Sequence, residues 1–331
     1  MIAVDHDLAT RLIDRARFAP SAHNTQPTRV ALHQGKILIR ADPARQLPVS
    51  DPHGHDIRLS HGAFIEGLSI ALSEEHLHID GIEILPNDNP TQSIASVSVG
   101  SGGEADPLAA FVTSRTTWRG PFRKLHQAEQ LAQLAPLEGH PDISLITEHS
   151  TLTRIAQLTD EASLHFMRDA AQRRELLHWM RLTQRHDAYE RDGLNADAMG
   201  LGRVEAMGAR LVLGPFFALL DTVGLAAKLT AEAAITGNAA AIALYHRPTG
   251  EDPLITGRAL YRAWLAMEQA GLAGRPLSVL TDWTQTAEAM ARLAPLPSGR
   301  QLVKAFRIGV PDGDRRTKHE RLPVNELLLA S

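Results

Sequence analysis

The chain has 331 residues, of which 44% are hydrophobic and 22% charged, a composition typical of a folded globular protein that can bury a large core. Its net charge of −4 gives no electrostatic support for a nucleic-acid partner. It contains no cysteine, which excludes disulfides, cysteine nucleophiles, iron–sulfur clusters and cysteine-ligated zinc.

The first hundred residues predict two helices and four strands. An apolar stripe over 8–16 predicts a helix that ends before Pro20. Asp56 is expected to cap a second helix, whose apolar face covers 63–71. Strands are expected over 29–33, 36–40, 79–85 and 94–99, with the first pair joined at Gln34-Gly35.

The second part of the chain repeats this order of elements. A helix over 127–135 precedes a strand over 143–146. A later helix carries an apolar stripe over 259–267, with the same spacing as the stripe of the earlier helix, and Gly271 is its expected C-terminal cap. Further strands are expected over 277–281 and 303–308. The repetition indicates two related halves, with the boundary in the turn-rich loop over 100–106.

Residues 160–237 have no counterpart in the first half and are predicted to be helical. Within them, Leu211–Ala227 is an apolar run at the short limit for a bilayer span, but it contains Pro215 and Asp221. We therefore expect a buried helical hairpin or a lid, and no membrane span. The first residues lack the basic and then apolar run of a secretory signal, so the expected location is cytoplasmic.

One loop concentrates polar side chains in an unusual way: Ala19-Pro20-Ser21-Ala22-His23-Asn24-Thr25-Gln26-Pro27. It offers a hydroxyl, an imidazole and two carboxamides between two prolines. Neutral donors and acceptors on a stiff backbone suit the binding of a polar heterocycle. The alternative, a helix end that runs into a turn, explains the prolines and Ser21 equally well.

A second candidate motif is Arg115-Thr116-Thr117-Trp118-Arg119. Two guanidinium groups that flank a hydroxyl converge on one phosphate if the segment starts a helix or turn, because arginine binds oxyanions through two parallel hydrogen bonds. The alternative is a solvated basic turn.

Other common sites are missing from the sequence. No glycine-rich dinucleotide or P-loop motif follows a strand, and no Gly-x-Ser-x-Gly elbow is present. The pairs His53/His55 and His76/His78 lack helical i, i+4 spacing and a third ligand, so no metal site is expected.

Together, the 19–27 and 115–119 motifs resemble those of the nitroreductase superfamily of FMN-dependent oxidoreductases. Each half of the chain keeps the motif that the other lacks, a pattern similar to the Acg family, in which one chain imitates a nitroreductase dimer. Thr28 and Thr116 depart from the residues usual at those positions in the superfamily. The resemblance implies an α+β, nitroreductase-like fold with mostly antiparallel sheets flanked by helices. It also implies an N-terminal lobe over 1–106 and a C-terminal lobe over 107–331 with a lid-like insertion at about 160–237.

The resemblance also implies a single FMN site between the two lobes. Arg115, Thr117 and Arg119 would contact the phosphate or ribityl chain, and Arg119 is the candidate cation near N1/O2 of the ring. Arg321 and Arg307 would complete the phosphate charge balance, and the backbone near Pro276 would lie beside the pyrimidine edge. No side chain is expected to be catalytic, since the flavin carries the chemistry. The candidate cofactor-binding residues are Pro20, Ser21, His23, Asn24, Gln26, Arg115, Thr117, Arg119, Pro276, Ser278, Arg307 and Arg321.

The leading functional interpretation is an NAD(P)H-linked ping-pong reductase of nitroaromatics, quinones or a similar planar, small-molecule electron acceptor. The alternative is an FMN-sequestering protein whose insertion covers the flavin, and a third interpretation is a flavin-free structural relic. The chain would be a monomeric pseudo-dimer or would associate further into a homo-oligomer.

Overall fold

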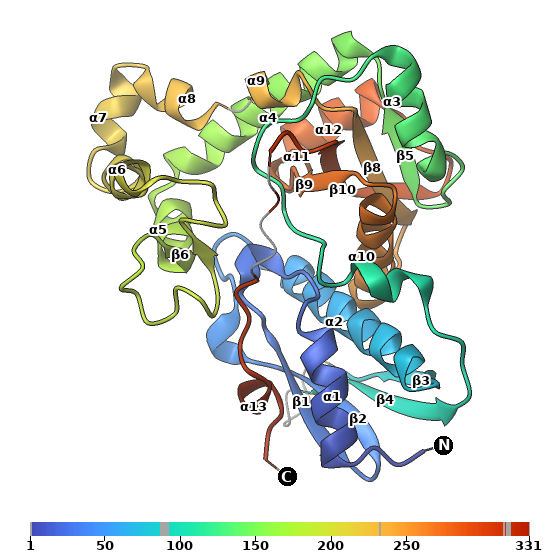
Figure 1. The fold of residues 1–331 in the computed structure, drawn as a ribbon. Coiled ribbons are helices and arrows are strands. Elements are labelled where there is room, and N and C mark those ends of the chain that lie inside the picture. Colours follow the sequence, from blue (N-terminus) through green and yellow to red (C-terminus); the bar gives the residue numbers. More distant parts are fainter. Residues whose placement is uncertain (1, 87–92, 232, 314, 316–318, 331) are drawn as a thin grey trace.

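The computed structural model describes residues 2–86, 93–231, 233–313, 315 and 319–330. The architecture is mixed α+β, with two antiparallel sheets and helices packed against them, which confirms the predicted class. Figure 1 shows two lobes stacked one above the other, with a group of short helices projecting from the upper lobe.

The first sheet has the strand order β1-β2-β4-β3. Its strands are β1 (Thr28–His33), β2 (Lys36–Ala41), β3 (Leu77–Ile84) and β4 (Ser93–Ser101). The predicted hairpin between the first two strands is confirmed: Gln34 and Gly35 both have positive φ, at 50° and 75°, the backbone that a tight two-residue turn requires.

The second sheet has the order β5-β8-β10-β9, which repeats the first in chain order. Its strands are β5 (Ile143–Ile146), β8 (Ala241–Pro248), β9 (Ala273–Pro276) and β10 (Arg300–Gly309), and a small parallel pair is formed by β6 (Met180–Arg181) and β7 (Leu194–Asn195). Ala241, Ala243 and Tyr245 pack into one core cluster and the alternate residues Ile242 and Leu244 into another. The sheet is therefore buried on both faces, which explains the unbroken apolar run of β8.

Among the described residues, thirteen α-helices and short 3₁₀ turns connect and cover these sheets. The helices are α1 (His6–Ala16), α2 (His55–Glu74), α3 (Gln127–Leu134), α4 (His149–Arg168), α5 (Ala170–Trp179), α6 (Arg203–Leu213), α7 (Phe217–Thr222), α8 (Leu225–Thr230), α9 (Ala233–Thr236), α10 (Pro253–Gln269), α11 (Val279–Asp282), α12 (Thr284–Leu293) and α13 (Val324–Leu327). The 3₁₀ turn η1 (Ala22–Asn24) lies in the polar loop between Ala19 and Pro27.

The two lobes meet where α2 crosses α10 (Figure 1). A Cβ atom at Gly62 would overlap the Leu254 carbonyl oxygen, and one at Gly257 would overlap the Leu59 carbonyl oxygen. The contact is thus reciprocal, and it pairs positions 195 residues apart (257 − 62).

The start of α2 differs from the prediction. Its N-cap residue is Gly54, and the Asp51 carboxylate accepts from the backbone N–H groups of His55 and Ile57 at 2.7 and 2.8 Å. Asp56 lies inside the first turn and is not the cap. Its carboxylate binds the ammonium group of Lys304 at 2.9 Å instead, because the second sheet brings that cation to the helix end.

The strand predicted over 277–281 is also wrong. The strand β9 lies at Ala273–Pro276, and the short helix α11 begins at Val279. Leu277 and Leu280 are both buried, and a spacing of three residues is a helical one rather than that of a strand.

The insertion after α4 is largely helical, as expected, but Leu211–Ala227 is not a buried hairpin. Phe217 is buried, whereas Leu219 and Val223 are 62% and 60% exposed. Within the residues that the structure describes, no helix has the length and apolar character that a bilayer crossing needs.

The C-terminal segment leaves the second lobe and returns to the first (Figure 1). Leu328 forms a parallel bridge with Val30 of β1, and Leu322 and Leu327 belong to the core beneath the first sheet. The last residues of the chain therefore stabilise the lobe that the first residues build.

We expect the replacement Gly62→Ala to lower the free energy of unfolding by about 3 kcal/mol, because the added methyl must push apart two closely packed backbones. Gly208→Ala is the matched control: it lies in α6 with open space around it, and should raise stability by up to about 1 kcal/mol. Denaturant unfolding of both variants checks this. Equal stability of Gly62→Ala and the wild type would contradict the described crossing.

Candidate functional site

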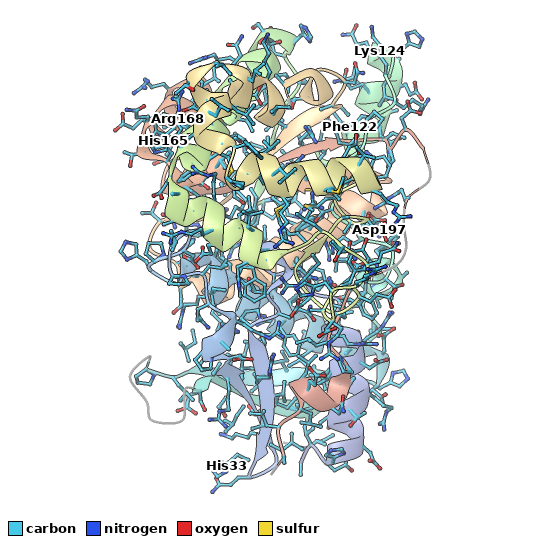
Figure 2. All side chains as sticks on the ribbon, turned by 90° about the vertical axis from the view of Figure 1, so that its left-hand side faces the viewer. His33, Phe122, Lys124, His165, Arg168 and Asp197 are labelled. Atoms are coloured by element: carbon cyan, nitrogen blue, oxygen red, sulfur yellow. The ribbon has the colours of Figure 1, made fainter. Side chains whose placement is uncertain are left out.

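A cavity of about 610 Å³ opens where the two lobes and the insertion meet. The first lobe contributes η1 and the start of α2, and the second contributes α10, α11, β10 and the segment 115–120. The insertion adds residues around Asp197, which Figure 2 places at mid-height, between His33 at one end of the molecule and Lys124 near the other. The volume falls in the range of small-molecule and cofactor sites.

The loop around η1 holds an uncommon backbone. His23, Asn24 and Gln26 have φ values of 48°, 54° and 50°, although none is a glycine. The Ser21 hydroxyl accepts from the Gln26 backbone N–H at 3.0 Å and so fixes the turn. Backbone strain of this kind is concentrated at binding and catalytic sites.

His23 lies on the cavity wall and is neutral in this setting. Burial lowers the pKa of its imidazole, with Glu175 and Asp56 acting in the opposite direction. Its Nδ1 atom is buried without a hydrogen-bond partner among the described residues. A buried, unpaired ring nitrogen on a cavity wall is available to a bound molecule.

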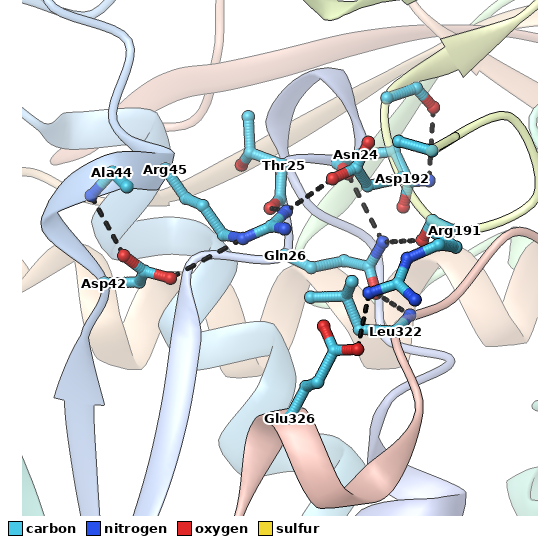
Figure 3. A network of polar contacts seen from close by, with 12 residues as sticks. Asn24, Thr25, Gln26, Asp42, Ala44, Arg45, Arg191, Asp192, Leu322 and Glu326 are labelled. Atoms are coloured by element: carbon cyan, nitrogen blue, oxygen red, sulfur yellow. Dashed lines mark hydrogen bonds and ion pairs between the residues drawn. The ribbon is translucent and has the colours of Figure 1, made fainter. Parts of the chain in front are cut away.

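The two carboxamides of this loop tie three segments together, and Figure 3 shows the contacts of Gln26 with Arg191 and Leu322. The Asn24 Nδ2 donates to the Gly193 and Glu320 carbonyl oxygens at 3.2 and 3.1 Å, and its Oδ1 accepts from Arg321 at 3.0 Å. The Gln26 Nε2 donates to the Arg191 carbonyl oxygen at 2.8 Å, and its Oε1 accepts from the Leu322 N–H at 2.8 Å. These amides hold the insertion and the C-terminal tail against the loop.

We call the junction of residues 24–26, 191–193 and 320–322 the latch. Ion pairs reinforce it. The buried Asp192 carboxylate forms an ion pair with Arg45 of the first lobe at 2.9 Å and another with Arg181 of the insertion at 2.7 Å. Figure 3 shows the pair with Arg45. Arg191 pairs with Glu326 of α13. The base of the insertion is therefore fixed to the first lobe by several independent contacts.

The basic part of the cavity wall is formed by Arg115 and Arg321. Each donates an N–H to the Phe18 carbonyl oxygen at 3.1 Å, so the two guanidinium groups meet at one acceptor. Burial lowers the pKa of Arg115, and burial together with the charge of Arg115 lowers the pKa of Arg321 to about 10. Both are still cations at neutral pH. Neither forms an ion pair with a carboxylate in the described residues, and the Nε atom of each is unpaired.

The aromatic surroundings of Arg115 explain how its charge is tolerated. Its guanidinium carbon lies 4.5 Å from the ring centroid of Trp264 and 5.7 Å from that of Tyr261. The ring faces stabilise the cation without neutralising it. The arrangement leaves a concentrated positive charge that an anion can bind.

The rest of the 115–119 motif is extended, not the helix or turn start that the spacing favoured. Thr117 forms an isolated parallel bridge with Gly274 of β9, and the Trp118 backbone N–H donates to the Gly274 carbonyl oxygen at 3.1 Å. Arg119 donates to the Ala198 carbonyl oxygen of the insertion at 3.1 Å. Thr117 and Arg119 still line the cavity, as do Pro276 and Ser278.

Two of the predicted residues do not reach the cavity. Arg307 is fully buried in β10, with its guanidinium 5.8 Å from the ring centroid of Phe122 and 3.4 Å from the Thr236 hydroxyl. Gln26 acts through the latch and does not line the cavity. The other ten line it: Pro20, Ser21, His23, Asn24, Arg115, Thr117, Arg119, Pro276, Ser278 and Arg321.

The sequence interpretation missed a charged group on the same cavity. Lys304 of β10 is 94% buried, and its ammonium lies 2.9 Å from Asp56 and 3.6 Å from Asp282. All three side chains line the cavity. The available signal was two charged residues, Lys304 and Arg307, in the apolar run from Leu302 to Ile308, where a buried charge requires a partner.

The cavity therefore combines an anion-binding corner with an aromatic and aliphatic wall that includes Leu59, Leu260 and Trp264. These features fit a planar molecule that carries a phosphate. In the part of the chain that the structure describes, no His, Asp and Glu side chains are grouped as ligands of a metal ion.

No model of a known protein family matches this chain, and no curated protein is significantly similar in sequence. Solved structures that are distantly similar to this chain in their fold include the following three. A nitroreductase with bound FMN from Bacteroides fragilis is 12% identical, with 68% of this chain and 100% of that chain covered and a TM-score of 0.37. An iodotyrosine deiodinase bound to FMN and 3-iodo-L-tyrosine is 14% identical, with 67% and 97% covered and a TM-score of 0.36. The FMN-dependent nitroreductase NfnB from Mycobacterium smegmatis, in complex with NADPH, is 17% identical, with 62% and 88% covered and a TM-score of 0.34. Similarities at this level do not assign the chain to a family.

We expect Gln26→Ala to lower the free energy of unfolding by about 2 kcal/mol, because it leaves the buried Leu322 N–H and the Arg191 carbonyl without their partner. Gln127→Ala, at the exposed first turn of α3, is the control and should change stability by less than about 0.5 kcal/mol. Urea unfolding monitored by tryptophan fluorescence measures both. A Gln26→Ala protein as stable as the control would mean that the latch contributes nothing.

Proposed function

We propose that this protein is an FMN-binding oxidoreductase that transfers a hydride from NAD(P)H to a planar acceptor such as a nitroaromatic or a quinone. The observation that carries the proposal is the meeting of Arg115 and Arg321 at the Phe18 carbonyl oxygen, on the wall of a cavity large enough for a cofactor. Two adjacent cations that have no carboxylate partner among the described residues are costly to bury. An anion bound between them would offset that cost.

The phosphate of FMN is the anion that we assign to this corner. Arg115 and Arg321 would bind it with support from the Thr117 hydroxyl, and Trp264 would lie against the apolar part of the cofactor. The backbone near Pro276 and Ser278 would meet the polar edge of the ring, as the resemblance to nitroreductases implies. Bound FMN supplies the hydride chemistry, and the protein supplies position, charge and access.

The residues of the 19–27 motif have divided roles in this proposal. Pro20, Ser21 and His23 would contact the ring or the ribityl chain from the first lobe. Asn24 and Gln26 would act mainly through the latch, which keeps this loop and Arg321 in place. Arg119, beside Ala198, is the candidate cation that stabilises the negative charge gained by the ring on reduction.

We further propose that the chain works as two related lobes, 1–106 and 107–331, that form one site between them, with a lid-like insertion at about 160–237. The identical strand order of the two sheets and the reciprocal α2–α10 crossing support this division. One chain would then do what two subunits do in a nitroreductase dimer. Further association of such pseudo-dimers into a homo-oligomer would depend on their outer surfaces and not on this site.

The purified protein should be yellow and bind one FMN per chain, with FMN bound roughly 10- to 100-fold more tightly than riboflavin, since the phosphate makes charge-assisted hydrogen bonds. Arg115→Gln should remove most of this difference and leave riboflavin binding unchanged. Arg292→Gln, on the exposed face of α12, is the control. Fluorescence titration of each variant measures the two affinities. A colourless protein without FMN affinity would overturn the proposal.

NADPH should bleach the bound FMN rapidly in anaerobic stopped-flow experiments. Arg119→Ala should lower the flavin midpoint potential by about 30 mV, which corresponds to roughly 1.4 kcal/mol for two electrons. Arg123→Ala, half exposed outside the cavity, is the matched control. Bound FMN that NADPH does not reduce would favour a sequestering role, and an unchanged potential in Arg119→Ala would exclude the role given to that residue.

A further inference from the structure

A second charged cluster, Lys304 with Asp56 and Asp282, lines the same cavity and is not used by the proposed function. Lys304 enters the cavity wall from β10, Asp56 from the first turn of α2 and Asp282 from the end of α11. The three come from distant parts of the chain and from both lobes. A charged group assembled in this way is costly to bury unless every member is paired.

The pairing is unequal. Both carboxylate oxygens of Asp56 lie 2.9 Å from the Lys304 ammonium, whereas the nearest Asp282 oxygen lies 3.6 Å from it. The Asp282 side chain is 36% exposed, against 8% for Lys304. Asp56 therefore satisfies the lysine, and Asp282 keeps a carboxyl group open to the cavity.

The surrounding charges favour a proton on Asp282. Burial raises the pKa of Asp282, the Lys304 ammonium opposes this, and the Asp56 carboxylate raises it further. For Asp56, burial is outweighed by Lys304, and its pKa is lowered. The pKa of Lys304 is raised because the two carboxylates outweigh its burial. These directions make Asp282, rather than Asp56, the carboxyl that takes up a proton more readily.

The other polar and titratable groups around Asp282 are few. The Thr281 hydroxyl donates to its Oδ1 at 3.1 Å. From α4, His165 stacks on the neighbouring Trp283 at a centroid distance of 4.2 Å. From α12, the exposed Glu288 is paired with Arg292. Asp51 acts on Lys304 from the loop before α2.

We propose that Asp282 is the hydrogen-bond donor that binds the oxygen of the acceptor, and the source of the proton that its reduction consumes. This inference rests on the proposed function, and it names the carbonyl or nitro oxygen of the planar acceptor as the atom that the site recognises. A quinone that receives a hydride becomes an anion and needs one further proton. The O–H bond of Asp282 breaks, a new O–H bond forms on the acceptor oxygen, and the carboxylate left beside Lys304 is reprotonated from water.

The test measures binding and needs no turnover. Menadione, a quinone without a titratable group, is titrated into the oxidised, FMN-loaded protein without a reductant, and the flavin absorbance reports the dissociation constant. In the wild type this constant should rise roughly tenfold between about pH 4.5 and pH 8, as Asp282 loses the donated proton. Asp282→Asn keeps an N–H donor but cannot ionise, so its dissociation constant should change less than about twofold over the same range.

Two further variants make the outcome decisive. Asp282→Glu should restore the pH dependence, and Glu288→Gln, which removes a carboxylate from the exposed face of the next helix, should behave as the wild type. This inference is wrong if the proteins bind FMN but the menadione dissociation constant changes equally with pH in the wild type and Asp282→Asn. It is also wrong if that constant does not change with pH in the wild type. Failure to load FMN at all would instead overturn the proposed function.

Discussion

The crossing of α2 and α10 is the constraint on which the rest of the molecule depends. Gly62 and Gly257 let two backbones approach to a distance that no Cβ atom would permit. This contact fixes the distance between the two sheets, and Leu59 and Leu260 of these same helices line the cavity between the lobes. A larger separation would draw the polar loop of the first lobe away from the arginines of the second.

The sequence predicts the local elements well where a single strong signal exists. The hairpin at Gln34-Gly35, the apolar faces of α1, α2 and α10 and the strand β10 all follow from turn chemistry and hydrophobic periodicity. Seven of the candidate residues in the two motifs line one cavity, and the resemblance added three more, Pro276, Ser278 and Arg321. Asp56 was the expected cap of α2, but Asp51 accepts the N–H groups of the first turn and Asp56 binds Lys304, a contact that no local pattern reveals.

Features that depend on distant contacts were beyond the sequence. The strand β9 contains a glycine and a proline, weak strand formers, and exists because β10 pairs with it. Asn24 and Gln26 were correctly singled out, but their amides contact the backbone of the insertion and the tail, whose positions no local pattern reveals. The same holds for Asp282, which meets Lys304 only once the second sheet and α11 have packed together.

The return of the C-terminal segment to the first lobe has a consequence for the order of folding. Arg321 and the leucines that anchor α13 follow the second sheet in the chain, while the surfaces that they contact, on β1 and the 18–26 loop, precede it. The contact between Arg321 and Phe18 joins residues 303 positions apart. Contacts of such long range form late, because the entropy of closing the loop must be lost first. The anion-binding corner is therefore among the last parts of the structure to be completed.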